Sequence, residues 1–167
     1  FIHILCHELG HALVARWYGM KPRIELVPFG GVTIWNPIKR LSFKQDLLIA
    51  LAGPVFGAVS GAVAFALLAF TKDQQIPAFL HYLLQHMFII GIVWSILNLL
   101  PIKPLDGYSI LDNLIAMVKG HRQPRFTLQI SFIFAIMGIV AAFMIRQYFL
   151  MAFLGFMCWQ IKRELDI

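Results

Sequence analysis

The sequence predicts an all-α membrane protein with several transmembrane helices and one short β-hairpin. Sixty per cent of its 167 residues are apolar and only 13% are charged, whereas soluble domains have about 45–50% and about 25%. The mean hydropathy of +0.78 agrees. We expect a single domain embedded in a lipid bilayer. The net charge of +6 is typical of basic cytoplasmic loops, so we expect no nucleic-acid partner.

Five apolar segments predict the helices. Residues 46–70, 77–100 and 126–145 can each span a bilayer, which takes about 20 helical residues. Residues 1–18 begin inside an apolar run, so we expect one or more upstream helices to be missing. Residues 148–161 form a shorter segment, which we expect to be tilted or interfacial. Within the second segment, Gly53, Gly57 and Gly61 form a stripe that predicts close packing against the first helix, with lining of the active site as the alternative.

The segment between the first two helices predicts a β-hairpin. Residues 23–35 are rich in β-branched and aromatic side chains, with Phe29, Gly30 and Gly31 at their centre. This pattern indicates two short strands around a Gly-Gly turn. Because lipid does not tolerate unpaired strand edges, we expect the hairpin to be covered by protein, to lie at the interface, or to line a wet cavity.

The distribution of Lys and Arg predicts which side of the membrane each loop faces. If the helices alternate in direction, twelve of the fourteen basic residues fall on one side, and this side is expected to be cytoplasmic. The other side receives only Lys72 and Arg146. His7 and His11 precede Arg16 on the first helix, which places them about 8–14 Å inward from the cytoplasmic end of that helix.

The first helix carries the pattern His7-Glu8-Leu9-Gly10-His11. Positions i and i+4 share a helix face, so both imidazoles can bind one ion. The HExxH arrangement supplies two zinc ligands and a carboxylate that acts as general base on a metal-bound water. Ionisable residues inside a membrane are costly, which favours a functional role for the three polar residues.

A stable catalytic zinc site needs a third protein ligand. His3 would extend the histidine stripe, but three histidines over two helical turns span about 12 Å, too far for one ion. We expect His3 to snorkel toward the helix end, or alternatively to line the cavity. The remaining candidates are Asp106 and Asp112. Asp106 has the better context, because prolines interrupt the chain just before it and an extended segment at membrane depth is permitted beside a cavity. The alternative for Asp106 is an N-cap of the following helix.

The two polar motifs together resemble those of the site-2 protease family of intramembrane zinc metalloproteases. HELGH in an apolar helix is followed much later by NLLPIKPLDG, which matches the family pattern NxxPxxPLDG. A Gly-Gly pair and an Ala-Gly-Pro segment lie between them. The resemblance covers about residues 1–118 and implies one Zn²⁺ per chain, held by His7, His11 and Asp106. It also implies that Glu8 is the catalytic base and that Asn98 stabilises the scissile carbonyl; a helix–helix hydrogen bond is the alternative role for Asn98.

The family resemblance also implies a substrate site on the hairpin. An unwound substrate would pair with the strand edge at Phe29, Gly30, Gly31 and Val32, which is a form of β-augmentation. The alternative is that the hairpin is a structural plug.

The sequence thus predicts one transmembrane metalloprotease domain over residues 1–167, with a broken helix carrying the third metal ligand. We expect no PDZ or CBS domain in it. The expected function is regulated intramembrane proteolysis of a transmembrane protein by a multi-pass enzyme whose active site lies toward the cytoplasm. The alternatives are an inactive relative that binds membrane clients and a metal transporter. The sequence indicates no oligomeric state.

Overall fold

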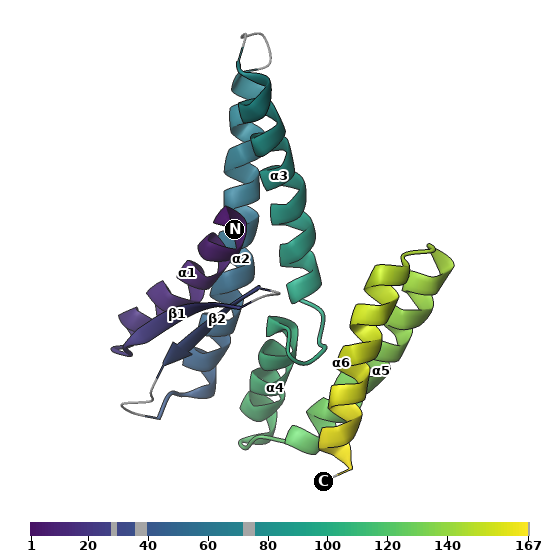
Figure 1. The fold of residues 1–167 in the computed structure, drawn as a ribbon. Coiled ribbons are helices and arrows are strands. Elements are labelled where there is room, and N and C mark those ends of the chain that lie inside the picture. The colour runs from purple at the N-terminus through teal and green to yellow at the C-terminus, as the bar shows by residue number, and fades with distance from the viewer. Residues whose placement is uncertain (28–29, 36–39, 72–75, 167) are drawn as a thin grey trace. The chain divides into compact units, whose positions relative to one another are not determined.

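Six helices and two strands form the part of the chain that the structure, a computed structural model, describes: residues 1–27, 30–35, 40–71 and 76–166. In chain order they are α1 (Ile2–Trp17), β1 (Pro22–Val27), β2 (Gly30–Trp35), α2 (Phe43–Phe70), α3 (Ala78–Asn98), α4 (Asp106–Lys119), α5 (Pro124–Met144) and α6 (Tyr148–Leu165) (Figure 1). The predicted helical fold with one hairpin is confirmed. The chain forms two compact units, Phe1–Asn98 and Leu99–Ile167.

Three of the described helices, α2, α3 and α5, are long and apolar enough to cross a membrane. They correspond to the three spanning segments expected from the sequence. Helix α2 begins three residues earlier than expected because Ser42 and Gln45 form a capping box. Each side chain of the box bonds to the other residue's backbone N–H, which satisfies donors that a helix start leaves without partners. Asp46 then lies in the first turn, where a negative charge is favourable.

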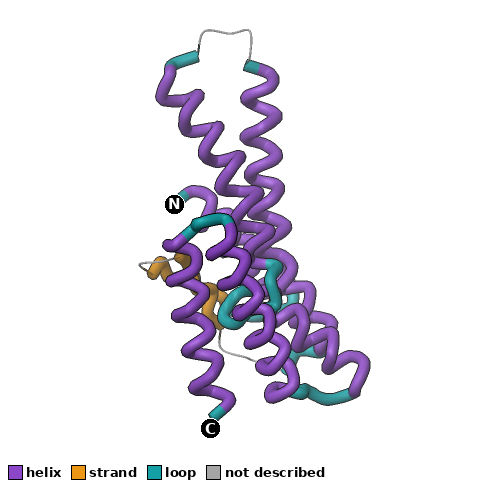
Figure 2. The backbone as a smooth tube through the Cα atoms, turned by 90° about the vertical axis from the view of Figure 1, so that its right-hand side faces the viewer, coloured by secondary structure: helices purple, strands orange, loops and turns teal. Residues whose placement is uncertain are grey.

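The first unit is held together by close helix contacts at glycines. Helices α2 and α3 lie side by side in both views (Figures 1 and 2), and a Cβ at Gly91 would be only 2.9 Å from the Cα of Gly61. A Cβ at Gly10 of α1 would lie 2.5 Å from the Ala52 carbonyl oxygen of α2. Small residues let membrane helices approach backbone to backbone. The glycine stripe of α2 faces α1 at Gly53, as expected, because a Cβ there would meet the His11 ring, but it faces α3 at Gly61.

The hairpin differs from its prediction in the place of its glycines. Strands β1 and β2 are antiparallel, and Gly30 and Gly31 pair with Val27 and Leu26. The expected Gly-Gly turn is therefore wrong, because both glycines are part of β2. A physical reason is the close approach of the strand to α1: a Cβ at Gly31 would collide with the side-chain methylene of Glu8. A side chain at this position would push β2 away from the helix.

The second unit has an apolar core between α5, α6 and the segment that precedes α4. Its buried members are Ile102, Leu128, Ala135, Leu154, Met157 and Ile161. Ile102 anchors the irregular segment, and the backbone N–H of Lys103 donates to the Ser131 hydroxyl of α5 at 2.9 Å. At the start of α4, Gly107 lies directly against the carbonyl oxygens of Leu99 and Leu100, where a side chain has no room. This packing holds the start of α4 in place.

Candidate metal and catalytic site

Helix α1 brings the two histidines of the HExxH pattern together. His7 and His11 are 5% and 7% exposed, and their Nε2 atoms lie 3.3 Å apart. Two nitrogens that bind one zinc ion tetrahedrally at about 2.1 Å are separated by about 3.4 Å. The spacing of the two imidazoles therefore fits a shared metal ion without movement of either side chain.

The orientation of His11 is set by helix α2. Its Nδ1 lies 2.7 Å from the Ile49 carbonyl oxygen, which can only accept a hydrogen bond. Nδ1 therefore carries the proton, and Nε2 has the lone pair that a metal requires. Gly53 lies against this same Nε2, where a Cβ would collide with the ring. Only glycine at this position leaves room for the His11 imidazole, so Gly53 of the stripe lines the candidate metal site.

Glu8 is held by the second strand of the hairpin. Its carboxylate is buried, with 6% of the residue exposed. The Thr33 hydroxyl donates to Glu8 Oε2 at 2.6 Å and lies 3.1 Å from the Glu8 backbone oxygen. Thr33 is a site residue that the sequence motifs do not indicate. The sequence feature that could have indicated Thr33 is the alternation of side chains along a strand, which places Thr33 on the same face as Gly31.

His3 lies one turn before His7 and is buried rather than snorkelling. It is 5% exposed, and its Nδ1 lies 3.2 Å from the Ser60 hydroxyl of α2. Ser60 in turn donates to the Gly57 carbonyl oxygen at 2.7 Å. The expectation that His3 snorkels toward the helix end is therefore wrong, because α2 covers the ring and supplies a hydrogen-bond partner.

Asn98 is the last residue of α3 and is also buried, at 7% exposed. Its Nδ2 donates to the Trp94 carbonyl oxygen at 3.0 Å. This bond lies within α3, so the observed hydrogen bond is not the helix–helix bond considered as an alternative. One N–H of the carboxamide is used in this way, and the group carries a second.

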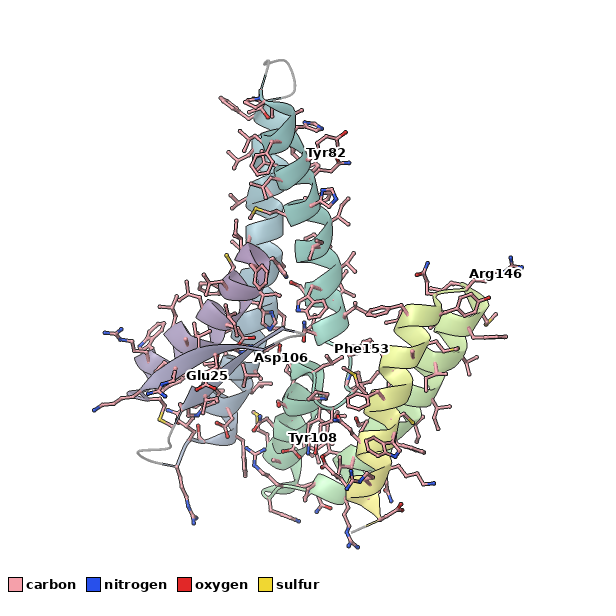
Figure 3. All side chains as sticks on the ribbon, viewed as in Figure 1. Glu25, Tyr82, Asp106, Tyr108, Arg146 and Phe153 are labelled. Carbon is pink, nitrogen blue, oxygen red and sulfur yellow. The ribbon has the colours of Figure 1, made fainter. Side chains whose placement is uncertain are left out.

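Asp106 lies in the second unit, as the first residue of α4 (Figure 3). Leu105 occupies the N-cap position of this helix, without a side-chain cap hydrogen bond, so the alternative role of Asp106 as the N-cap is wrong. The helical run does break between Asn98 and Asp106, as the two prolines predict.

Asp112, the other candidate ligand, contacts residues of its own unit through both carboxylate oxygens. Its Oδ1 accepts from the Thr127 hydroxyl at 3.0 Å, and its Oδ2 forms an ion pair with Arg122. Arg122 also donates to Asn113 Oδ1 at 3.1 Å. The carboxylate thus joins α4 to α5 and to the basic loop between them. This role of Arg122 is not indicated by the sequence, where Arg122 is one of several basic residues in a loop.

The candidate substrate residues lie on β2, except for one. Gly30, Gly31 and Val32 belong to the strand, and Val32 is 43% exposed on the face opposite Thr33. Phe29 lies outside the residues that the structure describes.

Comparisons with known proteins place the chain among metalloproteases. The model of peptidase family M50 matches residues 1–82 and 73–145. Zinc metalloprotease MJ0392 of Methanocaldococcus jannaschii is 32% identical over 122 residues, which are 72% of this chain and 34% of the relative. Stage IV sporulation protein FB of Bacillus subtilis is 30% identical over 126 residues, which are 71% of this chain and 41% of the relative. The chain thus spans less than half the length of these two curated relatives.

A solved structure shares the fold. The site-2 protease from Methanocaldococcus jannaschii aligns with a TM-score of 0.67 and 24% sequence identity, covering 100% of this chain and 76% of that one.

Proposed function

The chain belongs to peptidase family M50, the family of the site-2 proteases, and on this premise we propose that it is a zinc endopeptidase of the membrane interior. Its apolar helices and its family make it an integral membrane protein. The substrate is a peptide bond in or beside a transmembrane segment of another protein. The observation that carries the proposal is the pair of His7 and His11 Nε2 atoms, 3.3 Å apart beside a buried glutamate on one helix.

The proposed zinc ligands are His7, His11 and Asp106. The protonated Nδ1 of His11, fixed by the Ile49 carbonyl, supports its role as an Nε2 ligand. Asp106 is proposed as the third ligand because it is the acidic residue of the Asn98–Gly107 motif and because Asp112 is engaged by Arg122 and Thr127. Zinc bound here would polarise the scissile carbonyl and lower the pKa of a water molecule to about 7.

In the proposed reaction, Glu8 moves the proton. It accepts a proton from the attacking water as the water oxygen bonds to the carbonyl carbon. It then gives this proton to the amide nitrogen as the carbon–nitrogen bond breaks, so the products are a carboxylic acid and an amine. The second N–H of Asn98 donates to the carbonyl oxygen while negative charge develops on it.

The substrate must be extended for this reaction, because the amides of a helix are hydrogen-bonded and shielded. The edge of the hairpin at Phe29, Gly30, Gly31 and Val32 is proposed to pair with the unwound substrate segment. Since the basic loops favour a cytoplasmic location for the C-terminal end of α1, cleavage is proposed near the cytoplasmic face.

A Glu8→Gln substitution tests the proposed function. We would co-express the full chain with single-span membrane proteins and map any cut by mass spectrometry. The wild type is expected to cut near the cytoplasmic end of the span, and Glu8→Gln is expected to lose about 10³-fold in rate while retaining zinc. Cleavage by Glu8→Gln at the wild-type rate would overturn the assignment, and zinc flux into vesicles would favour a transporter.

Zinc content tests the third ligand. Asp106→Ala is expected to lose at least about 10-fold in zinc affinity, because two imidazoles alone do not hold a stable catalytic ion. Asp112→Asn is the matched control and is expected to bind zinc like the wild type. Normal zinc affinity in Asp106→Ala would exclude Asp106 as a ligand.

A further inference from the structure

The hairpin contacts the proposed catalytic base directly through Thr33. The donor–acceptor distance from Thr33 Oγ1 to Glu8 Oε2 is 2.6 Å, which is in the range of hydroxyl bonds to an ionised carboxylate, about 2.5–2.7 Å. The contact of the same hydroxyl with the Glu8 backbone oxygen is longer, at 3.1 Å. Because a hydroxyl has one proton, the shorter bond to Oε2 is the principal one.

The hydrogen bond from Thr33 stabilises a carboxylate that is buried away from water. Glu8 is 6% exposed, and a buried carboxylate is costly unless hydrogen bonds stabilise its charge. In the described part of the chain, Thr33 is the side chain that donates to it. Gly31, two residues earlier on the same face of β2, lies against the Glu8 methylene, and a Cβ there would also be 3.1 Å from Oε1. The strand therefore restrains the stem, and its Thr33 hydroxyl binds Oε2, whereas no described side chain donates to Oε1.

We propose that Thr33 is a positioning residue that holds Oε2 of Glu8 and directs Oε1 to the proton transfer. This inference rests on the proposed role of Glu8 as the general base. A general base must lie within hydrogen-bond distance of the proton that it takes, and a displacement of about 1 Å can cost about 10²-fold in rate. Val32 and Ile34 point to the opposite, exposed face of the same strand. One strand thus connects the candidate substrate edge to the base.

The test compares Thr33→Val with Thr33→Ser in the full chain, purified in detergent. Valine keeps the shape of threonine but removes the hydroxyl, whereas serine keeps the hydroxyl and removes a methyl group. Ile34→Val, on the outer face of the same strand, is the control for loss of one methylene. The probe is a single-span membrane protein that the wild type cleaves, and the readouts are kcat, KM, zinc content and the melting temperature.

Thr33→Val is expected to lower kcat by about 10- to 100-fold with KM changed less than about threefold and zinc retained. Thr33→Ser is expected to recover most of the rate, and Ile34→Val to match the wild type. A rate for Thr33→Val equal to that of the wild type would overturn the inference. So would a serine variant as slow as the valine variant, or a loss that lies in KM or zinc content.

The failures of the two proposals are distinguishable. If Glu8→Gln cleaves like the wild type, the assignment of the base fails and the inference about Thr33 fails with it. If Glu8→Gln is inactive while Thr33→Val is fully active, only the role of Thr33 is wrong.

Discussion

Two buried carboxylates, Glu8 in the first unit and Asp112 in the second, have opposite surroundings. Glu8 is 6% exposed and Asp112 is 7% exposed, so burial does not separate them. Asp112 is paired with the Arg122 guanidinium and accepts from the Thr127 hydroxyl. Glu8 accepts from the neutral Thr33 hydroxyl and, in the described part of the chain, has no ion pair with a basic side chain.

The difference shows how surroundings decide what a buried acid can do. A cation beside a carboxylate stabilises its charged form and ties it to one geometry, which suits a structural link between helices. A carboxylate held at one oxygen by a neutral donor is oriented, but it retains an oxygen that can accept a proton. The surroundings of Glu8 therefore suit its proposed role as a general base, and those of Asp112 suit a structural link.

Exchanging each acid for its amide is expected to give the largest contrast between the two residues. Glu8→Gln should lower the cleavage rate about 10³-fold with little change in stability, because the amide can still accept from Thr33. Asp112→Asn should lower the free energy of unfolding by about 2–3 kcal/mol, less than for a fully buried pair because Arg122 is partly exposed. Its rate per zinc-loaded molecule should stay near that of the wild type.

These effects are measured by thermal unfolding in detergent and by the cleavage rate normalised to bound zinc. The structural role of Asp112 would be wrong if Asp112→Asn retained full stability, or if it lost activity while still folded and loaded with zinc.

A smaller effect is expected from the strand that supports Glu8. Gly31→Ala places a methyl group against the Glu8 side chain, so β2 must shift, and overpacking of this kind costs about 1–2 kcal/mol. Gly30→Ala is the control for stability, because nothing lies within 4 Å of its added Cβ. The difference in melting temperature between the two variants measures the cost. Equal melting temperatures would show that β2 does not restrain Glu8.

The sequence was sufficient where the chemistry lies within one helix. The i, i+4 spacing of His7 and His11 placed both imidazoles on one helix face. The long, continuously apolar segments indicated the spanning helices α2, α3 and α5. The prolines before Asp106 likewise indicated a helix break. Each of these features depends on local geometry, which a helix or a proline imposes on its own neighbours.

Other features depended on contacts between distant segments. Only the packing of α2 against α1 showed that His3 is buried beside Ser60, and that Gly53 leaves room for the His11 ring. Only the pairing of β1 with β2 showed that Gly31 belongs to a strand rather than a turn.

The sequence by itself determined the membrane class, the zinc-binding pattern and the candidate base of this protein. The tertiary structure decided how these groups are held: His11 by the Ile49 carbonyl, Glu8 by Thr33, and Asp112 by Arg122. The physical reason is that periodicity and backbone restrictions act over a few residues. A hydrogen bond to a buried side chain, in contrast, depends on which segment the fold brings within about 3 Å of it.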